Sequence, residues 1–233
     1  MTERIVVADA PELVRQAAEW LITELTRAIT ERGACAVALA GGRTPQPVYR
    51  ALAAAGDVDW NRVDVFFGDE RAVPPDHPES NFRMVQEALL AHVPIPAKRV
   101  HRMEAERTDR DAAARDYERA LPARLDVVLL GMGPDGHTAS LFPRSPALAE
   151  RRLVVPVVAP KPPPERLTIT PIVIQAAREV GMMATGADKA AMVARATEGP
   201  LAVAEVPAQL ARRGTWFLDE AAAGQLTVRR VAR

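Results

Sequence analysis

The chain has 233 residues, of which 48% are hydrophobic and 26% charged, so we expect one globular domain over residues 1–233. Its 30 Lys and Arg residues balance 30 Asp and Glu residues, which disfavours generic nucleic-acid binding, so any bound anion must be held by local groups. The N-terminus lacks a secretory-signal pattern, and no apolar run approaches the roughly 18 residues of a membrane span. We therefore expect a cytoplasmic protein with no membrane partner.

Strand-like and helix-like patterns alternate along the chain. Apolar residues at helical spacing from Pro11 to Ile29, followed by Gly33, predict a long surface helix that ends at a glycine cap. Five short apolar runs then predict strands, and they cover Cys35–Ala40, Val63–Phe67, Leu125–Leu130, Leu153–Val158 and Val180–Thr185. The alternation predicts a mostly parallel sheet with helices on both faces.

Local features complete this plan. Cys35 is the only cysteine, so no internal disulfide can form, and its apolar surroundings indicate a buried residue rather than a nucleophile. The run Thr108-Asp109-Arg110-Asp111 is typical of a capping box, which would open a helix ending at Ala120. Lys161-Pro162-Pro163-Pro164-Glu165 predicts an extended loop. A solvated basic tail is expected at Arg229, Arg230 and Arg233.

The first strand ends in a glycine-rich turn, Gly41-Gly42-Arg43-Thr44-Pro45. Paired glycines let the backbone pass close to a ligand, Thr44 can cap a helix, and Pro45 suits the first helical position. The free N–H groups of such a helix N-terminus would bind one phosphate group. An ordinary strand-to-helix turn capped by threonine remains the alternative.

The second strand ends in a charged turn, Gly68-Asp69-Glu70-Arg71. The planar guanidinium of Arg71 suits phosphate oxygens or developing negative charge, and Asp69 could bind sugar hydroxyls or orient a catalytic group. A solvated loop with an internal Asp–Arg pair is the alternative.

The third strand leads into a turn that carries Asp135 and His137. Imidazole changes charge near neutrality, so His137 beside a carboxylate is a candidate general base. The run 131–136 also matches the G-x-G-x-x-G pattern of dinucleotide-binding proteins. Pro134 and Asp135 occupy the turn where a helix should open, and Asp135 would repel a pyrophosphate, so nicotinamide is not expected.

Two cations follow later strands or loops. Lys189 follows the strand that ends at Thr185, at the start of a predicted helix, and could reach a phosphate. Arg166, which follows the proline loop, is a similar candidate. No histidine has a partner at metal-ligand spacing, so we expect no metal. Because parallel strands present their carboxyl ends at one edge, the polar turns are expected to converge there on a ligand.

The chain resembles the 6-phosphogluconolactonases of the glucosamine-6-phosphate isomerase/6-phosphogluconolactonase family. The resemblance rests first on the glycine-rich turn, the charged turn and the turn with His137, in this order along the chain. The turn with His137 belongs to a longer matching run, Gly131 to Pro143. Three further runs carry the resemblance across nearly the whole chain: His77-Pro78-Glu79-Ser80-Asn81, Pro162 to Thr168, and Thr185 to Lys189. The resemblance implies an α/β fold, a modified doubly wound (Rossmann-like) α/β/α sandwich with a mostly parallel central sheet. It also implies no metal or organic cofactor, and we expect a monomer or homodimer.

The implied reaction is hydrolysis of 6-phospho-D-glucono-1,5-lactone to 6-phospho-D-gluconate, in the oxidative pentose phosphate pathway. His137 would take a proton from water and return it to the leaving ring oxygen, while Asp135 and Asp69 are candidates to orient His137 or the sugar hydroxyls. The residues implied to hold the phosphate or a developing oxyanion are Gly41, Gly42, Arg43, Thr44, Arg71 and Lys189, with Arg166 as a weaker addition.

Two other functions remain as alternatives. Glucosamine-6-phosphate deaminases share the three turns but carry a glutamate five residues after the histidine, where this chain has Phe142. A non-catalytic sugar-phosphate sensor is the second alternative, and the presence of His137, Asp135 and Asp69 argues against it.

Overall fold

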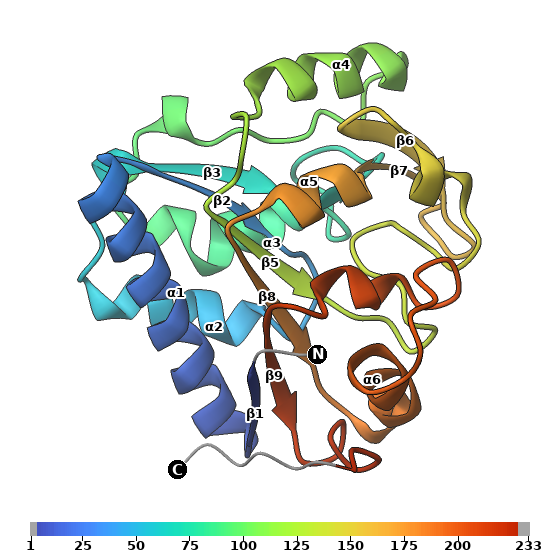
Figure 1. Cartoon of the computed structure of the whole chain (residues 1–233). Coiled ribbons are helices and arrows are strands. Elements are labelled where there is room, and N and C mark those ends of the chain that lie inside the picture. Colours follow the sequence, from blue (N-terminus) through green and yellow to red (C-terminus); the bar gives the residue numbers. More distant parts are fainter. Residues whose placement is uncertain (1–3, 228–233) are drawn as a thin grey trace.

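The structure, a computed structural model, describes residues 4–227, and the basic residues Arg229, Arg230 and Arg233 lie outside that range. A six-stranded sheet runs through the centre of the molecule (Figure 1). Every neighbouring pair in this sheet is parallel. Its order is β1 (Arg4–Ala8), β9 (Thr215–Asp219), β8 (Glu179–Ala184), β5 (Val127–Gly131), β2 (Cys35–Leu39) and β3 (Val63–Phe67).

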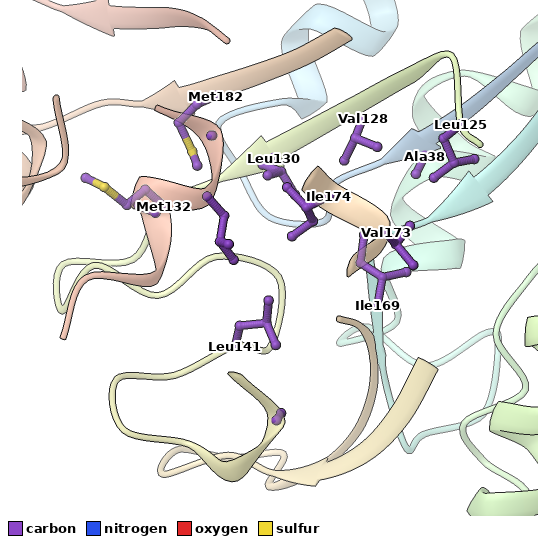
Figure 2. Close-up of a cluster of buried hydrophobic side chains, with 14 of the residues drawn as sticks. Ala38, Leu125, Val128, Leu130, Met132, Leu141, Ile169, Val173, Ile174 and Met182 are labelled. Carbon is purple, nitrogen blue, oxygen red and sulfur yellow. The ribbon is translucent and has the colours of Figure 1, made fainter. Parts of the chain in front are cut away.

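Helices cover both faces of this sheet, because side chains that alternate along each strand enter two separate cores. Val37 and Leu129 join the core formed with α1 (Ala10–Arg32), α2 (Gln46–Ala55) and α3 (Asn81–Ala88). Their neighbours Ala38 and Val128 face the other core, part of which Figure 2 shows. That second core is formed with α4 (Arg110–Ala120), α5 (Pro171–Ala176) and α6 (Ala190–Thr197). The implied α/β/α sandwich is confirmed.

Most sequence-predicted elements are present. The helix α1 is capped by Asp9, which accepts a hydrogen bond from the Glu12 N–H group at 3.0 Å, and ends at Gly33 with φ of 80°. Cys35 is buried, as expected, and burial raises the pKa of its thiol. No helix within residues 4–227 is long and apolar enough to cross a membrane.

The strand predicted at Leu153–Val158 exists, but its assignment to the parallel sheet was wrong. It forms β6 (Val154–Val158) of a second, antiparallel sheet, in the order β4 (Asp69–Arg71), β7 (Glu165–Ile169) and β6. The connection from Val158 to Glu165 is short, and parallel neighbours need a crossover of about a dozen residues. The strands β1, β4, β7 and β9 were not predicted.

Two predicted helix caps are also corrected. Pro45, with no side-chain hydrogen bond, occupies the N-cap of α2, and Thr44 instead lies 3.1 Å from the Thr185 hydroxyl. At α4 the N-cap is Asp109, which accepts a hydrogen bond from the Ala112 N–H group at 2.8 Å, rather than Thr108. In both cases a neighbouring residue one position away takes the cap, which sequence spacing alone does not resolve.

Candidate active site

A cavity of about 700 Å³ lies at the carboxyl ends of β2, β3, β5 and β8. The predicted convergence of the polar turns at one sheet edge is therefore confirmed. The sequence-predicted residues that line this cavity are Gly41, Gly42, Arg43, Thr44, Asp69, Arg71, His137, Arg166 and Lys189. Asp135 does not line it and reaches it only through His137.

The Asp135 carboxylate contacts the His137 ring directly. Nδ1 of His137 donates a hydrogen bond to Oδ1 of Asp135, which also accepts the His137 backbone N–H at 3.2 Å. Burial alone raises the pKa of Asp135, but the hydrogen bond and charge of His137 outweigh it and hold that pKa at about 2. A proton fixed on Nδ1 leaves Nε2, which has no partner among residues 4–227, as the basic nitrogen.

The backbone around His137 holds its ring in place. A Cβ at Gly133 would overlap the imidazole, so glycine is required at that position. The Gly133 N–H group donates to the His137 carbonyl at 2.9 Å, and the Phe142 ring packs against the imidazole with centroids 4.6 Å apart. The imidazole is thus confined between a tight turn and an aromatic wall, with 11% of its side chain exposed.

Asp69 belongs to a different network. Its carboxylate accepts hydrogen bonds from Nδ2 of Asn81 at 3.0 Å and from Oγ of Ser140 at 2.5 Å, and Nη1 of Arg166 lies 4.0 Å away. No hydrogen bond or ion pair joins Asp69 to His137. Of the two aspartates proposed from the sequence to orient the histidine, Asp135 alone has the geometry for it.

Arg71 and Arg166 face each other across the register of β4 and β7. Nη1 of Arg71 donates to the carbonyl of Glu79 at 2.7 Å, while Arg166 donates from Nε to the carbonyl of Pro163 at 3.0 Å and from Nη1 to Ser140 at 3.4 Å. Nη2 of Arg166 has no partner among residues 4–227. Burial lowers the pKa of Arg166 despite the nearby Asp69 charge.

Glu70 anchors the N-terminus of α3 and does not face the cavity. Its carboxylate accepts the backbone N–H groups of Asn81 and Phe82, each at 2.8 Å, and the Ser80 hydroxyl at 3.0 Å. A carboxylate is favoured there by the helix dipole, although burial raises the pKa of Glu70. Residues 69–71 therefore form a short strand in which Glu70 is bound to the start of α3. The alternative of a solvated loop, which the sequence analysis allowed, is wrong.

The turn after β2 presents unused donors to the cavity. The backbone N–H groups of Gly42, Arg43 and Thr44 have no acceptor among residues 4–227, and Gly42 has φ of 95°. Across the cavity edge, Nζ of Lys189 donates to the carbonyl of Thr185 at 3.0 Å. Because Thr44 and Thr185 are hydrogen-bonded, this turn and Lys189 belong to one side of the cavity.

Three residues of the site were not predicted from the sequence: Asn81 and Lys161 line the cavity, and buried Ser140 contacts the lining residues Asp69 and Arg166. Asn81 fixes Asp69 and lies so close to Gly41 that a Cβ there would overlap its amide; Ser140 bridges Asp69 and Arg166. Lys161 lies in the proline loop and also lines the cavity. Asn81 and Ser140 stand inside the runs that carried the resemblance, which was their only signal, and the loop around Lys161 offered none.

Within residues 4–227 no cluster of three or more His, Cys, Asp and Glu side chains could hold a metal ion. The cavity combines a histidine–aspartate pair with several cations: Arg43, Arg71, Lys161, Arg166 and Lys189. The arrangement can bind an anionic ligand and move one proton at Nε2 of His137.

The chain is similar to proteins of known family in both sequence and fold. A 6-phosphogluconolactonase of Streptomyces coelicolor is 43% identical, over 97% of this chain and 95% of its own length. The crystal structure of a Thermotoga maritima 6-phosphogluconolactonase matches with a TM-score of 0.82 and 30% identity, covering 93% of this chain and all of that one. A monomeric glucosamine-6-phosphate deaminase matches with a TM-score of 0.85 at 21% identity, covering 95% and 99%, which shows a common fold alone.

The family model for glucosamine-6-phosphate isomerases/6-phosphogluconolactonase matches residues 8–218. With the full-length likeness to relatives above 40% identity, this shows that the chain belongs to the glucosamine-6-phosphate isomerase/6-phosphogluconolactonase family.

Proposed function

We propose that this chain hydrolyses 6-phospho-D-glucono-1,5-lactone to 6-phospho-D-gluconate, with His137 as the general base. The lactone-hydrolysing activity is supported by the full-length likeness to 6-phosphogluconolactonases. The observation that carries the role of His137 is its hydrogen bond from Nδ1 to Asp135, which leaves Nε2 unpaired beside a cationic cavity.

The reaction needs one proton carrier. Nε2 of His137 removes a proton from water as the water oxygen bonds to the lactone carbonyl carbon, C1, and negative charge develops on the carbonyl oxygen. When this tetrahedral intermediate collapses, the bond from C1 to the ring oxygen breaks and the imidazolium returns the proton to that oxygen. Asp135 stabilises the imidazolium in between, because its low pKa keeps it ionised.

The two sides of the cavity suit the two ends of the substrate. The free N–H groups of residues 42–44 and the ammonium of Lys189 form a phosphate site near the start of α2. Arg71 and Arg166 are paired in the register of β4 and β7, and Arg166 and His137 both lie against the Phe142 ring, so we assign this second group of cations to the lactone end of the substrate. Binding the phosphate at one side holds C1 near His137 at the other.

A direct assay tests this proposal. Purified protein is mixed with freshly generated 6-phosphogluconolactone, and hydrolysis is followed above the spontaneous rate, while ammonia release from glucosamine 6-phosphate is measured in parallel. We expect hydrolysis without ammonia, because buried Phe142 occupies the position of the deaminase glutamate. A wild-type rate equal to the spontaneous rate contradicts the proposal; ammonia release would then favour a deaminase, and sugar-phosphate binding alone a sensor.

A further inference from the structure

The chain contains few lysines, and most of them line the cavity. Only Lys98, Lys161 and Lys189 are lysines among the 30 Lys and Arg residues, and Lys161 and Lys189 both line the cavity. Arginine serves as the cation at the other basic positions. An ammonium is a compact point charge that can approach one oxygen closely, whereas guanidinium offers a planar fork. Lys161 therefore calls for a functional explanation.

Lys161 is presented by a constrained loop. It stands between Pro160 and Pro162, whose rings fix their own backbone φ angles, in the connection from β6 to β7. The base of the loop is closed by a hydrogen bond from the Ala159 N–H group to the Pro164 carbonyl at 2.6 Å. Arg166 also holds the loop, through the carbonyl of Pro163. Lys161 itself is exposed and forms no hydrogen bond or ion pair with residues 4–227.

Three cations gather on this side of the cavity. Partial removal of Lys161 from water lowers the pKa of its ammonium, the charges of Arg166 and Arg71 lower it further, and those of Asp135 and Asp69 oppose the change. Like charges held near one another repel, and an anion bound between them offsets this electrostatic repulsion. The cluster also lies beside the proposed base: Arg166 lies 5.7 Å from the Phe142 ring centroid, and that ring packs against His137.

We propose that Lys161, with Arg71 and Arg166, forms a carboxylate subsite for the acid that the reaction releases. The inference rests on the proposed function. The lactone carries one anionic group, its phosphate, whereas the product carries a phosphate at C6 and a new carboxylate at C1. The cavity accordingly has a proposed phosphate site, at residues 42–44 and Lys189, and a second group of cations, which approaches His137 through the contact of Arg166 with the Phe142 ring, where the carboxylate forms.

The test compares two ligands that differ only at C1. 6-Phosphogluconate carries a carboxylate there, and glucitol 6-phosphate carries a neutral CH₂OH group on the same carbon chain. Calorimetry measures the affinity of each for the wild-type protein and for the Lys161→Met, Lys161→Arg and Lys98→Met variants. Lys98 is exposed and lies outside the cavity lining, so Lys98→Met is the matched control.

The wild-type protein should bind 6-phosphogluconate more tightly than glucitol 6-phosphate. Lys161→Met should lower the affinity for 6-phosphogluconate about tenfold, as expected for the loss of one charged hydrogen bond, and leave the affinity for glucitol 6-phosphate unchanged. Lys161→Arg, which keeps the charge, should retain most of the preference, and Lys98→Met all of it. The inhibition constant of 6-phosphogluconate in the lactonase assay should rise in Lys161→Met more than the KM for the lactone.

An equal loss of affinity for both ligands in Lys161→Met would overturn the assignment, because Lys161 would then bind the phosphate. Unchanged binding of both would overturn it as well. A wild-type protein that binds both ligands but hydrolyses no lactone would contradict the proposed function alone, and the Lys161→Met comparison would still decide the subsite. Binding of neither ligand to the wild-type protein would contradict both proposals.

Discussion

Asp135 accepts a hydrogen bond from Nδ1 of His137, two residues later in the same turn, while Asp69 is bound to Asn81 and Ser140. Asp135 and Asp69 therefore have different roles. One fixes the protonation pattern and orientation of the imidazole, and the other organises the wall on which Arg166 lies.

Replacing the carboxylate beside His137 should impair the chemical step. Asp135→Asn keeps the size of the side chain but removes the charge that fixes the proton on Nδ1 and stabilises the imidazolium. We expect kcat to fall on the order of 10²-fold with KM nearly unchanged, because the variant leaves the phosphate side intact. Steady-state kinetics checks this, with the exposed Asp57→Asn as control. A drop in affinity with unchanged kcat would contradict the role.

The low pKa of Asp135 also predicts a pH dependence of stability. Its folded-state pKa, about 2, lies below the ordinary aspartate value of 3.8, so the stabilisation is complete above about pH 4 and is lost as pH falls toward 2. The side chain is 45% exposed, so we expect about 1 kcal/mol after allowing for solvent screening. Urea unfolding should show the wild type more stable than Asp135→Asn at pH 6, with the difference narrowing toward pH 2.5. A constant difference would argue against it.

Gly41 should tolerate no side chain. A Cβ there would overlap the Asn81 amide that holds Asp69, so Gly41→Ala should lower the free energy of unfolding by about 1–3 kcal/mol and also reduce activity. Gly68→Ala is the matched control at the end of the next strand, since its Cβ would meet nothing closer than 3.9 Å. Thermal unfolding and lactone hydrolysis measure both effects. Equal behaviour of the two variants would show that the Asn81 contact is unimportant.

Removing the ammonium on the phosphate side should weaken substrate binding. Lys189→Met is expected to raise KM about 10- to 100-fold, the loss typical of a hydrogen bond to a charged group. Inorganic phosphate should inhibit the wild type competitively and the variant much less. If the variant lost kcat and kept KM, Lys189 would act on the reacting carbonyl instead.

The sequence predicted four of the six strands of the central sheet, without β1 and β9, and the positions of the three turns, because buried parallel strands are continuous apolar runs and their carboxyl ends share one edge. It did not predict the antiparallel sheet. Asp69–Arg71 is too short and too polar to be recognised as a strand, and β7 (Glu165–Ile169) directly follows a proline loop. Pairing between these distant segments is set by tertiary contacts.

The candidate site was predicted as a set of residues, not as a set of contacts. Turn chemistry identified His137 and Asp135, but the partner of Asp69 comes from α3, whose position depends on the buried anchor Glu70. Nor could spacing place Lys161 in the cavity, because that depends on β6 and β7 folding back on one another.

The role of His137 as general base is tested by the rate of lactone hydrolysis by His137→Ala. The rate is measured against the wild type on freshly generated 6-phosphogluconolactone and corrected for spontaneous hydrolysis. Glucitol 6-phosphate binding serves to confirm that the variant is folded. We expect kcat to fall about 10²- to 10⁴-fold while ligand binding is retained. A folded His137→Ala variant that keeps the wild-type rate would contradict it.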